Sequence, residues 1–226
     1  MEKKSFECGG RKAALYCGEK ADAPLIVLNH YSEDDGDSVL RAMREIDMPD
    51  CSLLVVGNIR WNHDMAPWDC APVIRNDAPY TGGADEHLNL LRTRLIPEAL
   101  ALTGGRPSFL GIAGYSLAGL FALYAAWRCD AFDRAACMSG SFWFPGFREY
   151  VLTHDPIRRP EKLYFSLGDR EAKTRHPILK TVQSNTEEIR EHCEALGIPV
   201  TWELNPGNHF SEDALRTAKG IRGILE

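Results

Sequence analysis

The chain alternates between short runs of apolar residues and longer segments in which apolar residues recur every three or four positions. Continuous apolar runs are typical of β-strands that are covered on both faces, and the longer spacing is typical of amphipathic helices. The predicted strands are residues 24–29, 52–58, 108–115, 135–140, 162–168 and 200–205. The predicted helices are residues 37–46, 84–102, 117–127, 177–196 and a last one from 211. Alternation of this kind predicts β-α-β units and a mostly parallel sheet between two helical layers.

The N-terminal region has a different pattern. Two short segments, SFECGG and KAALYCG, meet at Gly9 and Gly10 and predict an antiparallel hairpin. With it the sheet would have eight strands. The region 59–83, rich in Trp, Pro, Asn and Asp, is expected to be a long irregular loop, and loops of this length are usually functional or disordered. We find no internal repeat or linker, and expect residues 1–226 to form one α/β domain.

Composition and charge exclude some partners. The net charge of −6 is spread along the chain, and no basic stripe is present, so we expect no nucleic-acid partner. No segment approaches the roughly 20 apolar residues of a membrane helix. The N-terminus lacks the apolar run of a secretory signal, and the seven cysteines form no C-x-x-C pair. We therefore expect a cytoplasmic protein with reduced thiols. The sequence is also compatible with a homodimer.

One serine interrupts the apolar stretch GIAGYSLAGLFALYAAW, between a predicted strand and a predicted helix. Gly114 lies two residues before Ser116, Ala118 two residues after it, and Gly119 follows. The G-x-S-x-G pattern at such a junction is the nucleophile elbow, where the turn is sharp and neighbouring side chains must be small. The alternative is a helix cap, because serine is a favoured N-cap residue.

Two later segments supply partners for a nucleophilic serine. His209 lies in PGNHF, directly after the last predicted strand, and SLGDRE places Asp169 and Glu171 after the strand before it. The order serine, acid, histidine is the order found in α/β-hydrolases. The remaining histidines with no such placement are interpreted as surface residues: His87, His154, His176 and His192.

The stretch GIAGYSLAGLFALYA followed by FDRAACMSGSFWF resembles the Putative esterase group of the α/β-hydrolase superfamily. This group includes esterase D, enterochelin-type siderophore esterases and feruloyl esterases. LGDRE and GNHF also resemble the group, and DMAPW and GGADEHL do so more loosely. The resemblance implies a three-layer α/β-hydrolase fold and serine ester hydrolysis without a metal or an organic cofactor. Ala118 departs from the usual glycine of the elbow but is still small.

The resemblance also implies roles for individual residues. Ser116 would be the nucleophile and His209 its general base, and the oxyanion would be bound by the backbone N–H groups of Leu117 and Tyr31. The group's G-x-x-D pattern places the acid at Glu171, which is preferred over Asp169. Asp169 begins the turn and is well placed to accept hydrogen bonds from local backbone N–H groups instead.

Aromatic residues in the loops are candidates for a substrate pocket. Trp61, Trp68 and Trp143 would offer flat apolar walls, with Phe142 beside them, although each could equally anchor its loop. His63 and Asp64 are adjacent without a spaced third ligand, so they are a weak indication of a metal site. The preferred function is hydrolysis of a small-molecule ester or thioester. The alternatives are acyl transfer from the same serine and a non-catalytic binding protein.

Overall fold

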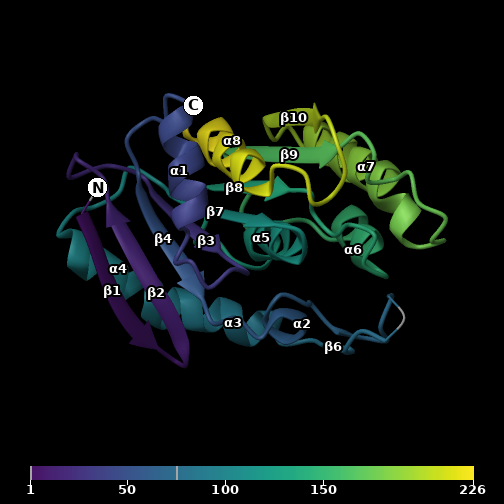
Figure 1. The fold of residues 1–226 in the computed structure, drawn as a ribbon, viewed down its shortest axis with the longest axis horizontal. Coiled ribbons are helices and arrows are strands. Elements are labelled where there is room, and N and C mark those ends of the chain that lie inside the picture. Colours follow the sequence, from purple (N-terminus) through teal and green to yellow (C-terminus); the bar gives the residue numbers. More distant parts are fainter. Residues whose placement is uncertain (1, 75) are drawn as a thin grey trace.

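The computed structural model describes residues 2–74 and 76–226, and its centre is an eight-stranded sheet (Figure 1). The strand order is β1-β2-β4-β3-β7-β8-β9-β10. The strands are β1 (Glu2–Cys8), β2 (Arg11–Cys17), β3 (Leu25–Asn29), β4 (Ser52–Gly57), β7 (Leu110–Tyr115), β8 (Arg134–Met138), β9 (Lys162–Gly168) and β10 (Val200–Asn205). Strand β2 is antiparallel to β1 and β4, and every other pairing in this sheet is parallel. The predicted mostly parallel sheet with an N-terminal hairpin is confirmed.

Helices cover both faces of the sheet and make three layers (Figure 1). One face packs against α1 (Asp37–Glu45) and α8 (Asp213–Leu225). The other face packs against α3 (Ala84–Leu90), α4 (Ile96–Thr103), α5 (Leu117–Arg128) and α7 (Val182–Ala195). Successive side chains of a strand point to opposite faces, so both alternating sets must be apolar. This explains the unbroken apolar runs of the sequence.

Helix α5 lies at the centre of its layer. Every residue from Leu117 to Trp127 is buried, and the helix packs along β7 and β8. A helix that is apolar on all sides is stable only in such a position, because no face of it can be left to water. Ser116, which directly precedes α5, is therefore held in place by strand β7 before it and by the buried helix after it.

Several short elements were not predicted. The region 59–83 contains α2 (Trp61–Asp64) and a two-stranded sheet of β5 (Asp69–Cys70) and β6 (Tyr80–Thr81). Helix α6 (Phe147–Thr153) follows the aromatic loop. The predicted helix 84–102 is divided by a π-helical segment, Leu91–Leu95, and a 3₁₀ turn, Leu179–Thr181, precedes α7. In the part of the chain that the structure describes, no helix is long and apolar enough to cross a membrane.

The prediction that His87 is a surface residue is wrong. The residue is 1% exposed on the inner face of α3, and its Nε2 atom lies 2.8 Å from Oδ1 of Asn29 at the end of β3. Its ring packs against Phe121. The position follows the helical spacing of Ala84, Leu88 and Leu91, which also face the core. Burial lowers the pKa of His87 to about 4, so the ring is neutral at pH 7.

Candidate active site

Ser116 occupies a sharp turn between the end of β7 and the first residue of α5. Its backbone angles are φ 60° and ψ −124°, a region that residues other than glycine rarely adopt. The turn is held by hydrogen bonds on both sides: the Ser116 N–H donates to the Met138 carbonyl at 3.0 Å, and its own carbonyl accepts the Ser141 N–H at 3.0 Å. Strain of this kind persists only where the surrounding structure enforces it. The serine hydroxyl is thereby presented at the edge of the sheet.

The neighbours of Ser116 must be small for this turn to close. A Cβ atom at Gly114 would lie 2.1 Å from the Ala118 carbonyl oxygen. A Cβ atom at Gly119 would lie 2.9 Å from the Gly114 carbonyl oxygen and 3.0 Å from that of Met138. Ala118 itself is fully buried, with its methyl group facing Gly114. Alanine thus fits at position 118 because position 114 has no side chain.

The structure brings Ser116, His209 and Glu171 together at the carboxyl edge of the sheet. The Nε2 atom of His209 lies 3.0 Å from the Ser116 hydroxyl, and its Nδ1 atom lies 2.7 Å from Oε2 of Glu171. The three residues follow β7, β10 and β9, whose carboxyl ends lie on the same edge of the sheet (Figure 1). The order hydroxyl, imidazole, carboxylate is the order that nucleophilic catalysis by serine requires.

Glu171 is enclosed by hydrogen-bond donors. Its side chain is 4% exposed, and its Oε1 atom accepts from the Ser139 hydroxyl at 2.7 Å and from the Gly168 N–H at 2.6 Å. The Arg216 guanidinium lies 3.3 Å from the same oxygen. Burial acts to raise the pKa of Glu171, but the bonds from His209, Gly168 and Ser139 outweigh it and leave the pKa below its ordinary value. The group is therefore a carboxylate at neutral pH.

Asp169 has a different partner. Its Oδ1 atom accepts the Gly207 N–H at 2.8 Å, and its own N–H donates to the Asn205 carbonyl at 2.8 Å. These bonds join the turn after β9 to the loop that carries His209. The geometry therefore separates the two acidic candidates: Glu171 contacts the imidazole of His209, and Asp169 binds the backbone N–H of Gly207.

Leu117 and Tyr31, the two residues with candidate oxyanion donors, follow the neighbouring parallel strands β7 and β3. Leu117 begins α5, where helix N–H groups have no acceptor within the helix. Tyr31 lies two residues beyond Asn29, which pairs with Gly114 at the end of β7, so both residues leave the same edge of the sheet. The loop at Tyr31 is fixed by His30, whose Nε2 lies 2.7 Å from Oδ1 of Asp34.

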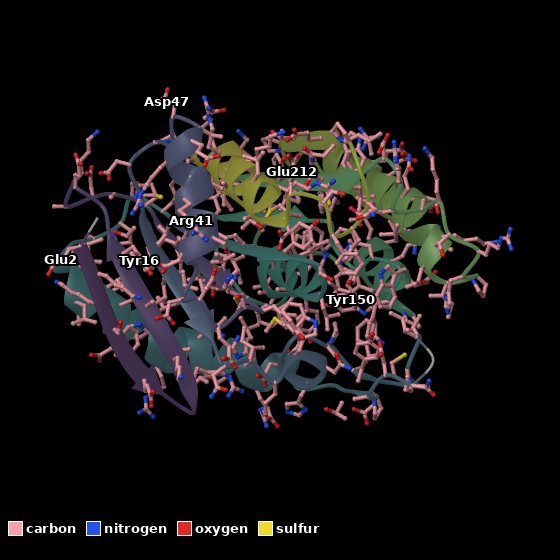
Figure 2. The ribbon with its side chains drawn as sticks, in the orientation of Figure 1. Glu2, Tyr16, Arg41, Asp47, Tyr150 and Glu212 are labelled. Atoms are coloured by element: carbon pink, nitrogen blue, oxygen red, sulfur yellow. The ribbon has the colours of Figure 1, made fainter. Side chains whose placement is uncertain are left out.

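The aromatic candidates differ in their surroundings. Trp68 donates from its indole N–H to the Pro145 carbonyl at 3.0 Å. Its ring packs against Phe144, Phe147 and Tyr150. Tyr150 points from α6 toward the region of α2 and β6 (Figure 2). These contacts favour the anchoring role for Trp68. Trp61 lies against the Tyr31 ring, with centroids 5.0 Å apart.

The two remaining aromatic candidates belong to the loop before α6. Trp143 is partly buried against the core, two residues after Ser141. Phe142 is fully buried and stacks on Phe147. It therefore packs inside the protein and offers no wall to a ligand.

Several residues at the site were not found from the sequence. Ser139 and Arg216 contact Glu171, and Phe210 packs its ring against His209 while remaining 87% exposed. Ser139 could have been found as a polar residue directly after β8, the neighbour of β7. Arg216 has no sequence signal, because a single arginine in a helix resembles any surface arginine. Across residues 2–74 and 76–226, no group of three or more His, Cys, Asp or Glu side chains is placed to hold a metal ion.

The sheet order, the serine elbow after β7 and the histidine after the last strand define the α/β-hydrolase fold. Residues 36–211 match the model of the family described as "Putative esterase". The chain belongs to this family and is a hydrolytic enzyme of the esterase type.

Solved structures share the fold at low sequence identity. An IroE-like serine hydrolase from Shewanella oneidensis is 18% identical, with 98% of this chain and 78% of that chain covered and a TM-score of 0.75. The siderophore hydrolase EstB from Aspergillus nidulans is 17% identical, with 99% and 94% covered and a TM-score of 0.75. The enterobactin esterase FES from Shigella flexneri is 15% identical, with 97% and 57% covered and a TM-score of 0.67. No curated protein matches the chain in sequence.

Proposed function

We propose that the protein is a serine carboxylesterase that cleaves an ester or thioester of a small molecule through an acyl-enzyme on Ser116. The observation that carries this proposal is the continuous series of hydrogen bonds from Ser116 through His209 to Glu171. Family membership supports ester hydrolysis as the reaction.

In the first half of the reaction, the Ser116 hydroxyl attacks the carbonyl carbon of the ester and transfers its proton to Nε2 of His209. The carbonyl oxygen becomes an oxyanion. When the tetrahedral intermediate collapses, the bond to the alcohol or thiol breaks, and the leaving group takes the proton from His209. Glu171 accepts a hydrogen bond from Nδ1–H and so keeps Nε2 free to act as the base.

The N–H groups of Leu117 and Tyr31 are proposed to bind the oxyanion. The N-terminal end of α5 adds its positive dipole end at the same point. Loss of one such donor typically costs about 2.7–4 kcal/mol of transition-state stabilisation. In the second half, water attacks the acyl-serine with His209 again as the base, and the carboxylic acid is released.

Aromatic rings in the loops after β3, β4 and β10 support a small-molecule substrate. Tyr31 with Trp61 and, beside His209, Phe210 offer apolar surface to the acyl or alcohol group. Solved structures with the same fold include proteins named as siderophore hydrolases and an enterobactin esterase. The cytoplasmic location and a homodimer stay predictions.

The Ser116→Ala variant tests the proposal. It should lose hydrolysis of p-nitrophenyl acetate by at least about 10³-fold and lose labelling by a fluorophosphonate probe, because no nucleophile remains. The matched control is Ser184→Ala on the exposed face of α7, which should retain both. Ester turnover by Ser116→Ala within about tenfold of wild type would exclude the acyl-enzyme. Product analysis with added alcohol separates hydrolysis from acyl transfer, and failure of wild type to label at all would indicate a binding protein.

A further inference from the structure

A single arginine is buried beneath the candidate triad. Arg216 of α8 is 1% exposed, and its guanidinium makes four contacts through its two terminal nitrogens. Nη1 contacts Oε1 of Glu171 at 3.3 Å, the Tyr115 hydroxyl at 3.3 Å and the Asn208 carbonyl at 3.0 Å. Nη2 donates to the Pro206 carbonyl at 2.8 Å. A buried cation is costly unless it is paired and hydrogen-bonded, so these contacts are what hold it there.

Two glycines make room for this guanidinium. A Cβ atom at Gly168 would lie 3.0 and 3.1 Å from the two terminal nitrogens of Arg216 and 2.5 Å from the Gly207 carbonyl oxygen. Gly207 has φ +107°, a conformation that favours glycine, and a Cβ atom there would lie 3.3 Å from Nη2. Both turns at this edge, after β9 and after β10, are therefore shaped around the arginine.

The arginine is linked to His209 by a second route. The Tyr115 hydroxyl donates to the backbone carbonyl of His209 at 2.7 Å and lies 3.0 Å from the Ser139 hydroxyl. Ser139 also lies 2.7 Å from Oε1 of Glu171. The carboxylate and the histidine loop are thus fixed relative to each other by one connected group of polar side chains.

We propose that Arg216 is a positioning residue for the esterase reaction, holding the His209 loop and Glu171 in register with Ser116. This inference rests on the proposed function. The fork of the guanidinium binds the carbonyls on both sides of Gly207, which is the geometry that fixes the loop. A lysine has a single charged nitrogen and cannot span both carbonyls and the carboxylate.

The experiment compares Arg216→Lys, Arg216→Met and the control Arg222→Met, a partly exposed arginine on the same helix. For Arg216→Lys we expect kcat to fall by about tenfold, with KM within about twofold, because the fork that binds the loop carbonyls is lost. For Arg216→Met we expect kcat to fall on the order of 10²-fold, with KM again within about twofold, because all four contacts are lost. Arg222→Met should match wild type.

Thermal unfolding establishes that each variant is folded. A kcat of wild-type size in Arg216→Lys would overturn the proposal, and so would a folded Arg216→Met in which KM rises and kcat is unchanged. If Arg216→Met does not fold, the lysine variant alone decides. Activity that survives in Ser116→Ala would instead contradict the proposed function.

Discussion

Glutamate at position 171 reaches the histidine by folding back over its own turn. Its Oε1 atom accepts the N–H of Gly168, three residues earlier, while Oε2 faces His209. The extra methylene, compared with aspartate, lets one carboxylate serve both the turn and the imidazole. Asp169 is closer to the strand and its shorter side chain binds Gly207 instead.

This difference gives a prediction for the two acids. Glu171→Gln should lose kcat on the order of 10⁴-fold, because the amide can donate to Nδ1 and stabilise the wrong tautomer. Asp169→Asn should lose less than about tenfold, because its amide oxygen can still accept the Gly207 N–H. Steady-state kinetics on purified variants measures both. The opposite ranking would assign the role to Asp169, and near-full activity in both would indicate a Ser116–His209 dyad.

Whether a site residue could be predicted from the sequence depends on whether it directly follows a predicted strand. Ser116, His209 and Glu171 each follow a predicted strand, and parallel strands end at one edge, so their proximity could be predicted. Arg216 could not, because its role depends on which helix face meets the histidine loop. His87 is predicted at the surface because it follows no predicted strand, although its helical spacing from Ala84, Leu88 and Leu91 points to the core.

Among the elements, the junction of β7 and α5 is the most restrictive. A side chain at position 114 would collide with the carbonyl at position 118, whereas position 118 already carries a methyl group in a helix. The two positions of the G-x-S-x-A elbow are therefore not equivalent.

We predict opposite outcomes for two substitutions in this elbow. Ala118→Gly should keep activity within a few-fold and lower the free energy of unfolding by about 1 kcal/mol, because glycine is a poorer helix former than alanine. Gly114→Ala should lose fluorophosphonate labelling, because the turn cannot close around the new methyl group. Urea unfolding and probe labelling of both variants give the comparison. A Gly114→Ala protein that labels at the wild-type rate would show that the elbow can relax.

The helices and strands that could be predicted are those whose own residues carry a repeated apolar pattern. The strands of the main sheet are apolar on both faces, and the long helices carry a repeated apolar stripe. Helices α2 and α6 and the β5–β6 pair are too short to carry such a pattern. They are held by contacts of Trp68, in region 59–83, with Pro145 and Tyr150 in and after the aromatic loop. These contacts join distant parts of the chain, so no local pattern predicts them.

At the scale of the whole molecule, His87 connects a helical layer to the sheet through Asn29. Its pKa is about 4 in the folded protein, against an ordinary value of 6.5. Between these values the unfolded chain takes up a proton that the folded protein does not. The free energy of unfolding should therefore be intact above about pH 7 and fall as the pH drops toward 4.

For wild type we expect a loss of about 2 kcal/mol between pH 7.5 and pH 5 from this residue. His87→Gln should be less sensitive to pH by that amount, because glutamine can still donate to Asn29 and does not titrate. His154→Gln, at an exposed position, is the control. Urea unfolding at both pH values measures the difference, and an equal pH dependence in wild type and His87→Gln would show that His87 is not responsible.

The aromatic side chains of the site divide into two groups, one packed into the fold and one exposed, which differ in how readily they can be replaced. Trp68 is tied into the packing of two loops, so its replacement changes the fold as well as the pocket. Tyr31 is 75% exposed and Phe210 is 87% exposed, so their side chains contribute little buried area to folding. If these two rings contact the substrate as proposed, replacements at positions 31 and 210 can change the ester preference without compensating changes in the core.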